Sequence, residues 1–281
     1  QGLTERYDKE IESLITEGYA EVVPPDKVAT ATRIWYLPHH HVLNVNKPNK
    51  LRIVFDCACP CEGRSLNDRV LQGPDLVNSL YSILLGFRHH CYAIQADVKA
   101  MYHQVKVPVP DRDALRFLWY SRGSLIHLRM TSHLFGGVWC SAISTYALRR
   151  TVFDCVDADP LLARAVLDCT YVDDCLISLN DKAGALTIIN DLPKLLERGG
   201  FVLTKFSANS RDLVDAIPIA HRAPAVHEFS KDSAGKALGV RWSVHDDAFN
   251  FVLSELAQSQ NDALTRRTML RVTASIYDPL G

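Results

Sequence analysis

The chain has 281 residues, of which 47% are hydrophobic and 22% are charged, a composition that is typical of a globular protein. Its formal net charge of −1 lacks the strongly basic balance that usually marks a nucleic-acid-binding protein. No apolar run approaches the roughly 18 residues of a membrane span, and no signal-peptide pattern opens the chain. Because the sequence starts at Gln1 and stops abruptly at Gly281, we expect it to be a piece of a longer protein.

The charged residues are unevenly distributed, although the net charge is small. Residues 31–70 hold six basic and three acidic side chains, a net charge of +3. Residues 151–181 hold seven aspartates and one arginine, a net charge of −6. This pattern suits a protein that binds phosphates on one side and metal ions on the other, and solvated surface charge is the alternative interpretation.

Apolar periodicity and turn-forming residues predict the elements of the first half of the chain. Helical spacing of apolar residues predicts an amphipathic helix over residues 4–18. Strands are expected at residues 34–37, 41–45 and 51–55, with a turn at residues 47–50. We expect Pro74 to begin a helix that runs through Leu85. The remaining elements of this half are a strand at residues 92–98, a hairpin of residues 115–120 and 124–129, and a helix at residues 138–150.

The second half of the chain continues the mixture of strands and helices. Residues 165–167 and 175–177 are expected to be two short strands around a tight turn. A helix at residues 182–197, a hairpin of residues 237–242 and 249–253, and a last helix at residues 262–275 complete the prediction. Because the strands and helices do not alternate as regular βαβ units, the pattern favours an α+β fold with an antiparallel sheet.

The strongest functional signal is the Tyr-Val-Asp-Asp run at residues 171–174, in the turn between the two short strands. Two adjacent carboxylates in an apolar setting raise each other's ionisation cost unless a cation neutralises them, and Mg²⁺ is the usual answer. A third carboxylate, Asp97, ends the apolar strand at residues 92–98. We therefore predict that Asp97, Asp173 and Asp174 are catalytic metal ligands for two-metal phosphoryl transfer. Asp97 and Asp173 form the expected bridging pair, Asp174 is the weaker contributor, and a strand-end cap is the alternative role of Asp97.

Cysteine and histidine spacing gives a weaker signal. The eight cysteines include no Cys-x-x-Cys pair, although Cys57, Cys59 and Cys61 alternate along the chain. Three thiols on one strand face can bind a metal, but reduced, small apolar side chains are the simpler interpretation. A metal-binding role is likewise the less favoured interpretation of the His39-His40-His41 run.

Nine segments follow one another in a characteristic order over nearly the whole chain. They are residues 35–40, 51–56, 73–76, 96–102, 135–136, 171–174, 199–206, 238–242 and 276–281. In this order they resemble the motifs of reverse transcriptases of long-terminal-repeat retrotransposons, most closely the BEL/Pao group. The resemblance implies an RNA-directed DNA polymerase that adds deoxynucleotides to a primer with two Mg²⁺ ions, for which Mn²⁺ can substitute.

The resemblance also implies a right-hand polymerase fold with fingers, a palm with an antiparallel sheet, and a partial thumb. Residues 1–90 match the amino-terminal segment and fingers, residues 91–235 the palm with finger insertions, and residues 236–281 the primer-grip hairpin and the start of the thumb or connection. The implied partners are an RNA or DNA template-primer, deoxynucleoside triphosphates and the protease, RNase H and integrase regions of a polyprotein, without a membrane. The implied location is intracellular, in cytoplasmic particles.

Several residues match the nucleotide site of this family. Arg52 matches the fingers arginine that binds the incoming triphosphate, with Lys47 or Lys50 as a second positive charge, and pairing of Arg52 with Asp56 is the alternative. Tyr102 matches the steric gate that excludes a 2′-hydroxyl group, with core packing as its alternative.

Three further parts of the family's site have counterparts. Phe135 and Gly136 match the element under the templating base pair, where glycine allows a close backbone approach. Lys205 matches a lysine beside the triphosphate that protonates pyrophosphate. The primer grip, which positions the primer end, is matched by Leu238, Gly239, Val240 and Trp242.

One departure from the family bears on activity. A Ser-Pro or Ala-Pro pair usually follows the Phe-Gly pair, whereas this chain has Gly137 and Val138. The missing proline favours a second hypothesis, a catalytically inactive retroelement fragment that folds and binds nucleic acid without polymerising. A third hypothesis is an RNA-dependent RNA polymerase, which Tyr102 opposes because ribonucleotide substrates require a small residue there.

Overall fold

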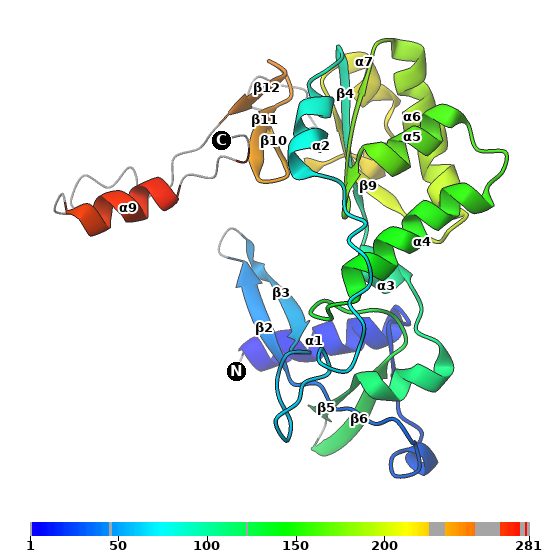
Figure 1. The fold of residues 1–281 in the computed structure, drawn as a ribbon, viewed down its shortest axis with the longest axis vertical. Helices are drawn as coiled ribbons and strands as arrows, with labels where there is room; N and C mark the ends of the chain where they lie inside the picture. Colours follow the sequence, from blue (N-terminus) through cyan, green and yellow to red (C-terminus); the bar gives the residue numbers. More distant parts are fainter. Residues whose placement is uncertain are drawn as a thin grey trace. The chain divides into compact units, whose positions relative to one another are not determined.

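The computed structural model of the chain describes residues 2–44, 47–121, 123–224, 234–250, 265–275 and 279. The chain forms two compact units (Figure 1): unit 1 comprises Gln1–Leu76 and Ala100–Ala147, and unit 2 comprises Val77–Lys99 and Leu148–Gly281. Both units combine helices with antiparallel strands, which confirms the predicted mixed α and β class. In the described part of the chain, no helix is long and apolar enough to cross a membrane.

Unit 1 is built around a three-stranded antiparallel sheet and a separate two-stranded hairpin. The sheet has the order β1-β6-β5, with β1 (Ala20–Val22), β6 (Ser124–Met130) and β5 (Arg116–Ser121). The hairpin pairs β2 (His39–Asn44) with β3 (Lys47–Phe55). The helices are α1 (Gly2–Thr16), η1 (Pro25–Lys27), α3 (Met101–Gln104), η2 (Val109–Leu115) and the first part of α4 (Cys140–Asp154).

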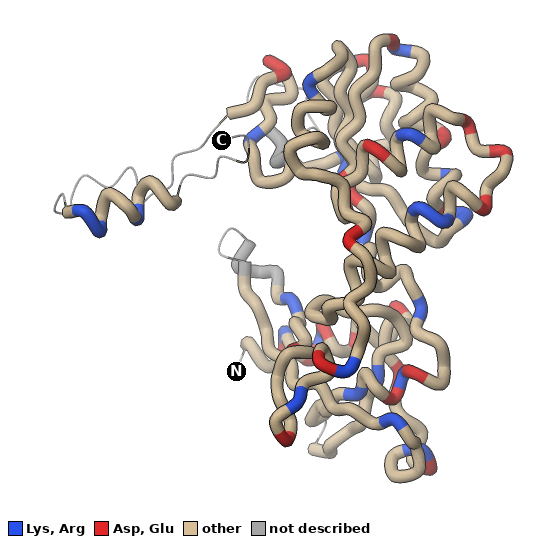
Figure 2. Tube along the Cα trace, viewed as in Figure 1, with Lys and Arg blue, Asp and Glu red and all other residues tan. Residues whose placement is uncertain are grey.

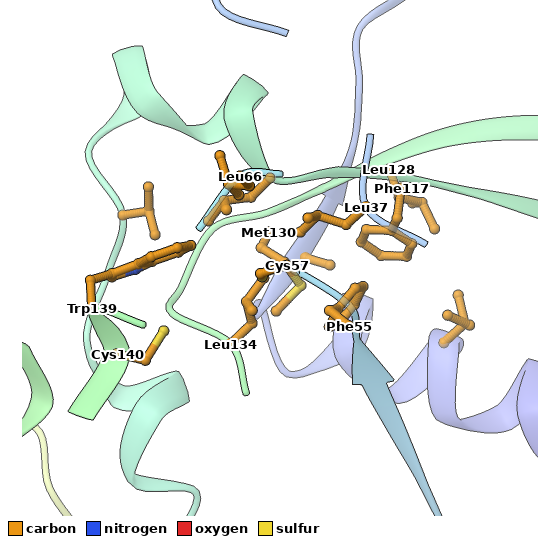
Figure 3. Close-up of a cluster of buried hydrophobic side chains, with 14 of the residues drawn as sticks. Leu37, Phe55, Cys57, Leu66, Phe117, Leu128, Met130, Leu134, Trp139 and Cys140 are labelled. Atoms are coloured by element: carbon orange, nitrogen blue, oxygen red, sulfur yellow. The ribbon is translucent and has the colours of Figure 1, made fainter. Parts of the chain in front are cut away.

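The core of unit 1 forms where the sheet, the hairpin and α1 meet. Phe55, Phe117, Leu128 and Met130 point toward one another in this cluster (Figure 3), and each is at most 3% exposed. The amphipathic pattern of α1 buries Tyr7, whose ring stacks on Trp119 with the centroids 4.6 Å apart. Each fully buried apolar side chain of this kind stabilises the fold by about 1.5–3 kcal/mol.

A buried ionic network fixes the loop before β5 to the sheet. Arg116 is fully buried and contacts the carboxylate of Asp113 at 2.8 Å. Its guanidinium also donates to the backbone carbonyls of Lys27 at 2.7 Å and Val28 at 2.9 Å. Arg129 contacts the same Asp113 carboxylate at 3.0 Å. Arg116 therefore joins both the loop that contains η1 and the segment that contains Asp113 to the sheet.

Unit 2 contains a four-stranded antiparallel sheet of the order β7-β8-β4-β9. Its strands are β7 (Thr170–Tyr171), β8 (Asp174–Leu179), β4 (Tyr92–Val98) and β9 (Leu203–Ala208). A smaller sheet follows, with β10 (Ala234–Ala237), β11 (Val240–Ser243) and β12 (Ala248–Asn250). The helices are α2 (Leu80–Phe87), α5 (Pro160–Asp168), α6 (Lys182–Glu197), α7 (Arg211–Ala216), η3 (Ile219–His221), α9 (Arg266–Ala274) and the second part of α4.

The two faces of the large sheet pack against different elements. Alternation along β4 and β8 places Ile94 and Ile177 on one face, and α5 and α6 pack against these strands. Ala93 and Leu176 lie on the other face, in a cluster with Phe87 of α2 and Trp242 of β11. Figure 1 shows α2 and β11 on one side of β4, with α5 and α6 on the other. The sheet is thus covered on both faces, and its charged side chains Asp97, Asp174 and Lys205 lie at one end.

Two elements of the prediction are wrong because capping residues were misread. Residues 165–167 belong to α5, not to a strand, because Asp159 caps that helix by accepting from Leu161 N–H and Pro160 begins it. The helix expected from Pro74 begins only at Leu80, after the cap residue Ser79.

Other boundaries also differ from the prediction. Residues 47–50 belong to β3 and are not a turn, and residues 34–37 form only a single bridge, between Tyr36 and Arg116. The strand expected at residues 237–242 is interrupted by a turn at Leu238 and Gly239, which creates a third strand in that sheet. Residues 251–253 and 262–264 of the predicted elements lie outside the described residues.

Candidate active site

The Tyr-Val-Asp-Asp run forms a tight hairpin, as predicted. Tyr171 of β7 pairs with Asp174 of β8, so Val172 and Asp173 form a two-residue turn. Val172 adopts φ 52°, a left-handed conformation that is unusual for a β-branched residue and costs about 1–2 kcal/mol. Glycine, asparagine or aspartate usually occupies such positions. Strain of this kind persists where the surrounding structure enforces it, which is common at functional sites.

The sheet brings the three predicted carboxylates to one end. Asp97 of β4 lies directly opposite Asp174 of β8 in the antiparallel register, so both project from the same face. The backbone of Asp173 is tied to β4 by a hydrogen bond of 2.7 Å from Val98 N–H to its carbonyl. Like charges placed directly opposite each other destabilise a sheet unless a cation lies close to them.

The electrostatics of the site reflect this crowding of negative charge. Burial, followed by repulsion from Asp173 and Asp97, raises the pKa of Asp174 to about 7. The positive charge of Lys205 and a hydrogen bond from Gln95 oppose this rise. Lys205 also forms an ion pair with Asp97, with 2.6 Å between Nζ and Oδ1.

The chemistry of these side chains fits a divalent cation of the magnesium type. Carboxylate oxygens are the ligands that Mg²⁺ prefers, and it is usually held by one or two of them while phosphates and water complete its shell. The repulsion recorded by the raised pKa of Asp174 is the kind that a bound cation relieves. In the described residues, no group of three His, Cys, Asp or Glu side chains is arranged to hold a metal ion together.

In the metal-free protein, we expect the contribution of Asp174 to the free energy of unfolding to increase as the pH falls from about 8 to about 5, and Asp174→Asn to remove this contribution. The folded-state pKa of Asp174, about 7, lies above the ordinary value of 3.8, so the folded state binds more protons between these values. The stabilisation is complete below the ordinary pKa and is lost as the pH rises through 7. It amounts to at most about 4 kcal/mol, because one pKa unit corresponds to about 1.4 kcal/mol.

Urea unfolding with a chelator at both pH values measures this difference. Comparison of parent and variant cancels the titration of all other groups. The same pH dependence in both proteins would contradict the raised pKa of Asp174.

Sequence reasoning missed Asn78, which supports the aspartate hairpin from outside. Its amide nitrogen donates to the carbonyls of Leu167 at 2.9 Å and Thr170 at 2.8 Å, and its amide oxygen accepts from Arg149 at 3.1 Å. These bonds fix the chain that enters the Tyr-Val-Asp-Asp turn. The helix predicted from Pro74 obscured this role, although Ser79, a good N-cap residue, was the available signal that Asn78 precedes the helix.

In unit 1, the structure brings Tyr102 and Phe135 together. Their rings meet edge to face with the centroids 4.6 Å apart. Tyr102 is half-buried against the core, and Phe135 is exposed. Gly136, with φ 113°, approaches the backbone so closely that a Cβ atom would lie 2.3 Å from the carbonyl oxygen of Phe55. Glycine is therefore required at position 136, because any side chain there would collide with the backbone at the end of β3.

The loop after Gly136, where the sequence has Gly137 and Val138, is held by a side chain from another part of unit 1. Val138 N–H, which a proline would lack, donates to the amide oxygen of Asn67 at 3.1 Å. The amide nitrogen of Asn67 donates in turn to the carbonyl of Gly136 at 3.3 Å. α4 then begins at Cys140. Asn67 therefore orders the approach to this helix through hydrogen bonds on both sides of Gly137.

The neighbouring Gly137 leaves room for a tryptophan. A Cβ atom at Gly137 would lie 2.7 Å from the ring of Trp139 and 2.9 Å from Sγ of Cys140. Trp139 donates its indole N–H to Nδ1 of the buried His133 at 3.0 Å. Burial lowers the pKa of His133 to about 4, so it accepts this bond as a neutral ring. A serine or alanine at position 137 is excluded by this packing.

Comparison with known proteins assigns the fold. No known family model and no curated protein matches the sequence. The foamy viral protease-reverse transcriptase in complex with double-stranded DNA matches with a TM-score of 0.61, 17% identity, and coverage of 96% of this chain and 46% of that chain. A second structure of this enzyme with double-stranded DNA matches with a TM-score of 0.61, 16% identity, and coverage of 96% and 39%. Its complex with an RNA/DNA hybrid gives a TM-score of 0.57, 16% identity, and coverage of 94% and 29%.

The chain has a reverse-transcriptase fold. It spans less than half the length of these viral proteins. The similarity covers 96% of the chain and therefore extends over parts of both units.

The predicted triphosphate-binding residues lie on β3 of this reverse-transcriptase fold. Arg52 is exposed and lies opposite Val42 of β2. It forms no ion pair with a described residue, and the carboxylate of Asp56 accepts from Ala58 N–H instead. The backbones of Lys47 and Lys50 belong to β3, and their side chains lie outside the described part.

In the histidine run, the ring of His39 is hydrogen-bonded within unit 1, and in the cysteine run, Cys57 packs in the core. His39 donates from Nε2 to the carbonyl of Leu118 at 2.9 Å, and Tyr7 donates its hydroxyl to the other ring nitrogen. Cys57 is buried in the core, where burial raises its pKa to about 12, whereas Cys61 is exposed. Neither run belongs to a three-ligand metal group among the described residues.

The predicted primer grip forms the turn and second strand of the small sheet. Leu238 and Gly239 make the turn, with φ 49° and 90°. Val240 is buried, and Trp242 is fully buried with its ring 4.8 Å from that of Phe87. Of these four residues only Gly239, in the turn, is exposed. The buried side chains of Val240 and Trp242 therefore anchor the hairpin. Of the carboxyl-terminal motif at residues 276–281, only Pro279 is described.

Proposed function

We propose that this chain is the RNA-directed DNA polymerase domain of a BEL/Pao-type retrotransposon polyprotein. The observation that carries the proposal is the position of the three aspartates at one end of the large sheet. Asp97 and Asp174 face each other across β4 and β8, and Asp173 lies in the strained turn beside them. Polymerases place carboxylates from separate strands in this way for two-metal phosphoryl transfer.

Each carboxylate has a defined task in this proposal. Asp97 and Asp173 would be the main ligands of the cations, and Asp174 would add negative charge from β8. Bound Mg²⁺, or Mn²⁺ in its place, supplies the charge that lowers the pKa of the primer 3′-hydroxyl and stabilises the leaving pyrophosphate. The hydrogen bond from Val98 N–H to the Asp173 carbonyl keeps the turn in register with Asp97.

The other predicted residues bind the substrates. The exposed Arg52 on β3, with Lys47 or Lys50, binds the triphosphate of a deoxynucleotide, and the ring of Tyr102 excludes a ribose 2′-hydroxyl. Phe135 supports this ring at 4.6 Å. In this assignment, unit 1 corresponds to the fingers and the large sheet of unit 2 to the palm.

A template-primer is the proposed nucleic-acid partner. Three arginines, Arg266, Arg267 and Arg271, recur along α9 (Figure 2), which begins the proposed thumb. Arginine suits contacts with the phosphate backbone. Structurally similar viral reverse transcriptases form complexes with double-stranded DNA and with an RNA/DNA hybrid, which supports this partner.

Primer extension on an RNA template with Mg²⁺ or Mn²⁺ tests the proposal. The parent chain, Asp173→Asn and a version extended at its carboxyl end are compared after circular dichroism has confirmed that each is folded. Extension by the parent but not by Asp173→Asn supports the polymerase and its metal site. Extension by the longer version alone locates the deficit in the thumb. No extension by either folded protein would contradict the proposal and favour the inactive fragment that binds nucleic acid.

A further inference from the structure

Lys205 occupies an irregular position of β9 beside the carboxylates. Asp97 pairs with Thr204 and Gln95 pairs with Ser207, so two residues of β9, the first of them Lys205, lie opposite a single residue of β4. This is a β-bulge, and Lys205 adopts φ 55° within it. Bulges near active sites commonly redirect one side chain.

The conformation of Lys205 is costly, and its side chain makes a specific contact. Glycine or asparagine adopts a left-handed conformation more easily than lysine. The Lys205 side chain is 59% exposed, yet its ammonium group contacts Oδ1 of Asp97 at 2.6 Å while the Asp97 side chain is 23% exposed. A residue held in an unfavourable conformation with its charge directed at a functional carboxylate indicates a role for that charge.

The contact also determines which groups reach Asp97. Thr204 donates its hydroxyl to the backbone carbonyl of Asp97 at 3.4 Å, whereas Lys205 contacts the carboxylate. Asp97 lies opposite the negatively charged Asp174, so a positive charge at this point offsets repulsion between the two strands.

We propose that Lys205 is an internal counter-ion that neutralises Asp97 in the metal-free protein and competes with the divalent cation for this carboxylate. The inference rests on the proposed function, which makes Asp97 a metal ligand. It is distinct from protonation of pyrophosphate, because it operates before any nucleotide is bound. A cation that binds Asp97 meets the positive charge of the ammonium group at the same carboxylate, so Lys205 weakens metal binding as long as this ion pair persists.

Mn²⁺ titration of the whole chain without nucleic acid, followed by electron paramagnetic resonance of free Mn²⁺, tests this proposal. Lys205→Asn removes the charge and tolerates the left-handed backbone, so the bulge is retained. We expect this variant to bind Mn²⁺ roughly ten times more tightly than the parent, the effect of removing one unit charge near the site. Lys205→Arg retains the charge and should bind within about twofold of the parent.

The matched control is Lys182→Asn in the same unit. Lys182 is exposed and forms an ion pair with Asp212, so its removal changes the net charge of the protein equally. Its Mn²⁺ affinity should equal that of the parent. Equal or weaker binding by Lys205→Asn, the same gain in Lys182→Asn, or no binding by any protein would overturn the counter-ion role.

The primer-extension assay separates this inference from the proposed function. Extension by the parent with unchanged Mn²⁺ affinity in Lys205→Asn would refute the counter-ion and leave the polymerase intact. Tighter Mn²⁺ binding by Lys205→Asn, without extension by either the parent or the version extended at its carboxyl end, would support the counter-ion and refute the polymerase.

Discussion

Substitution of Asp97 by asparagine should lower the rate of primer extension by about a thousandfold, which corresponds to about 4 kcal/mol of transition-state stabilisation. Asparagine keeps the shape of the side chain but loses the charge that holds a divalent cation. Asp97 lies directly opposite Asp174, and it is the carboxylate that contacts Lys205. We expect Asp174→Asn to have a smaller effect, about tenfold, because Asp174 is the weaker ligand in the proposed site.

The stability of these variants distinguishes a catalytic defect from a folding defect. Asp97→Asn removes repulsion from Asp174 and an ion pair with the exposed Lys205, which is worth about 0–1 kcal/mol. Its unfolding midpoint in urea should therefore remain close to that of the parent. The control Asp212→Asn lies in the same unit, is exposed and should extend primers normally. More than a tenth of the parent's rate in Asp97→Asn would argue against a metal ligand at this position.

Substitution of Arg116 by alanine should destabilise the protein by about 3–5 kcal/mol, the cost of breaking a buried ion pair from one side. Arg116 is fully buried, and its removal leaves Asp113 and the carbonyls of Lys27 and Val28 with fewer donors. Burial raises the pKa of Asp113, but hydrogen bonds from Arg116 and Arg129 outweigh it and keep this pKa below its ordinary value. The free energy of unfolding in urea measures the effect.

Two further variants test whether the geometry of Arg116 matters as well as its charge. Arg116→Lys keeps the charge but has no planar fork to reach Asp113 and two carbonyls together, so it should recover only part of the loss. Arg150→Ala removes an exposed pair with Asp154 and should cost less than about 0.5 kcal/mol. Equal losses in Arg116→Ala and Arg150→Ala would contradict the assigned role of burial.

Local sequence patterns were sufficient for the elements that hold the carboxylates. The apolar run at Tyr92–Val98 gave β4 with its bounds, and the helix at Lys182–Glu197 was also located correctly. The Tyr-Val-Asp-Asp turn was placed correctly as well, although one of its expected flanking strands belongs to α5. The error arose because apolar residues in a short segment fit a strand and a helix equally well. The cap at Asp159 with the following Pro160 was the deciding signal.

Contacts that depend on register were beyond local patterns. The opposition of Asp97 and Asp174 requires the pairing of β4 with β8, which no short segment specifies. The ion pair of Lys205 with Asp97 requires a bulge between β4 and β9. Asn78 supports the hairpin through a hydrogen bond to Thr170, which lies 92 positions further along the chain.

The hydrogen bond from Val138 N–H to the amide oxygen of Asn67 makes the effects of substitutions at these two positions depend on each other. A proline at position 138 would lack the N–H group that donates to the amide oxygen of Asn67, so proline is unfavourable there while Asn67 is present. Conversely, replacement of Asn67 removes the reason to avoid proline. Trp139 adds a third position to this dependence, because its ring occupies the space of a side chain at Gly137. A proline at position 138 should therefore be tolerated better together with substitutions of Asn67 and Trp139 than alone.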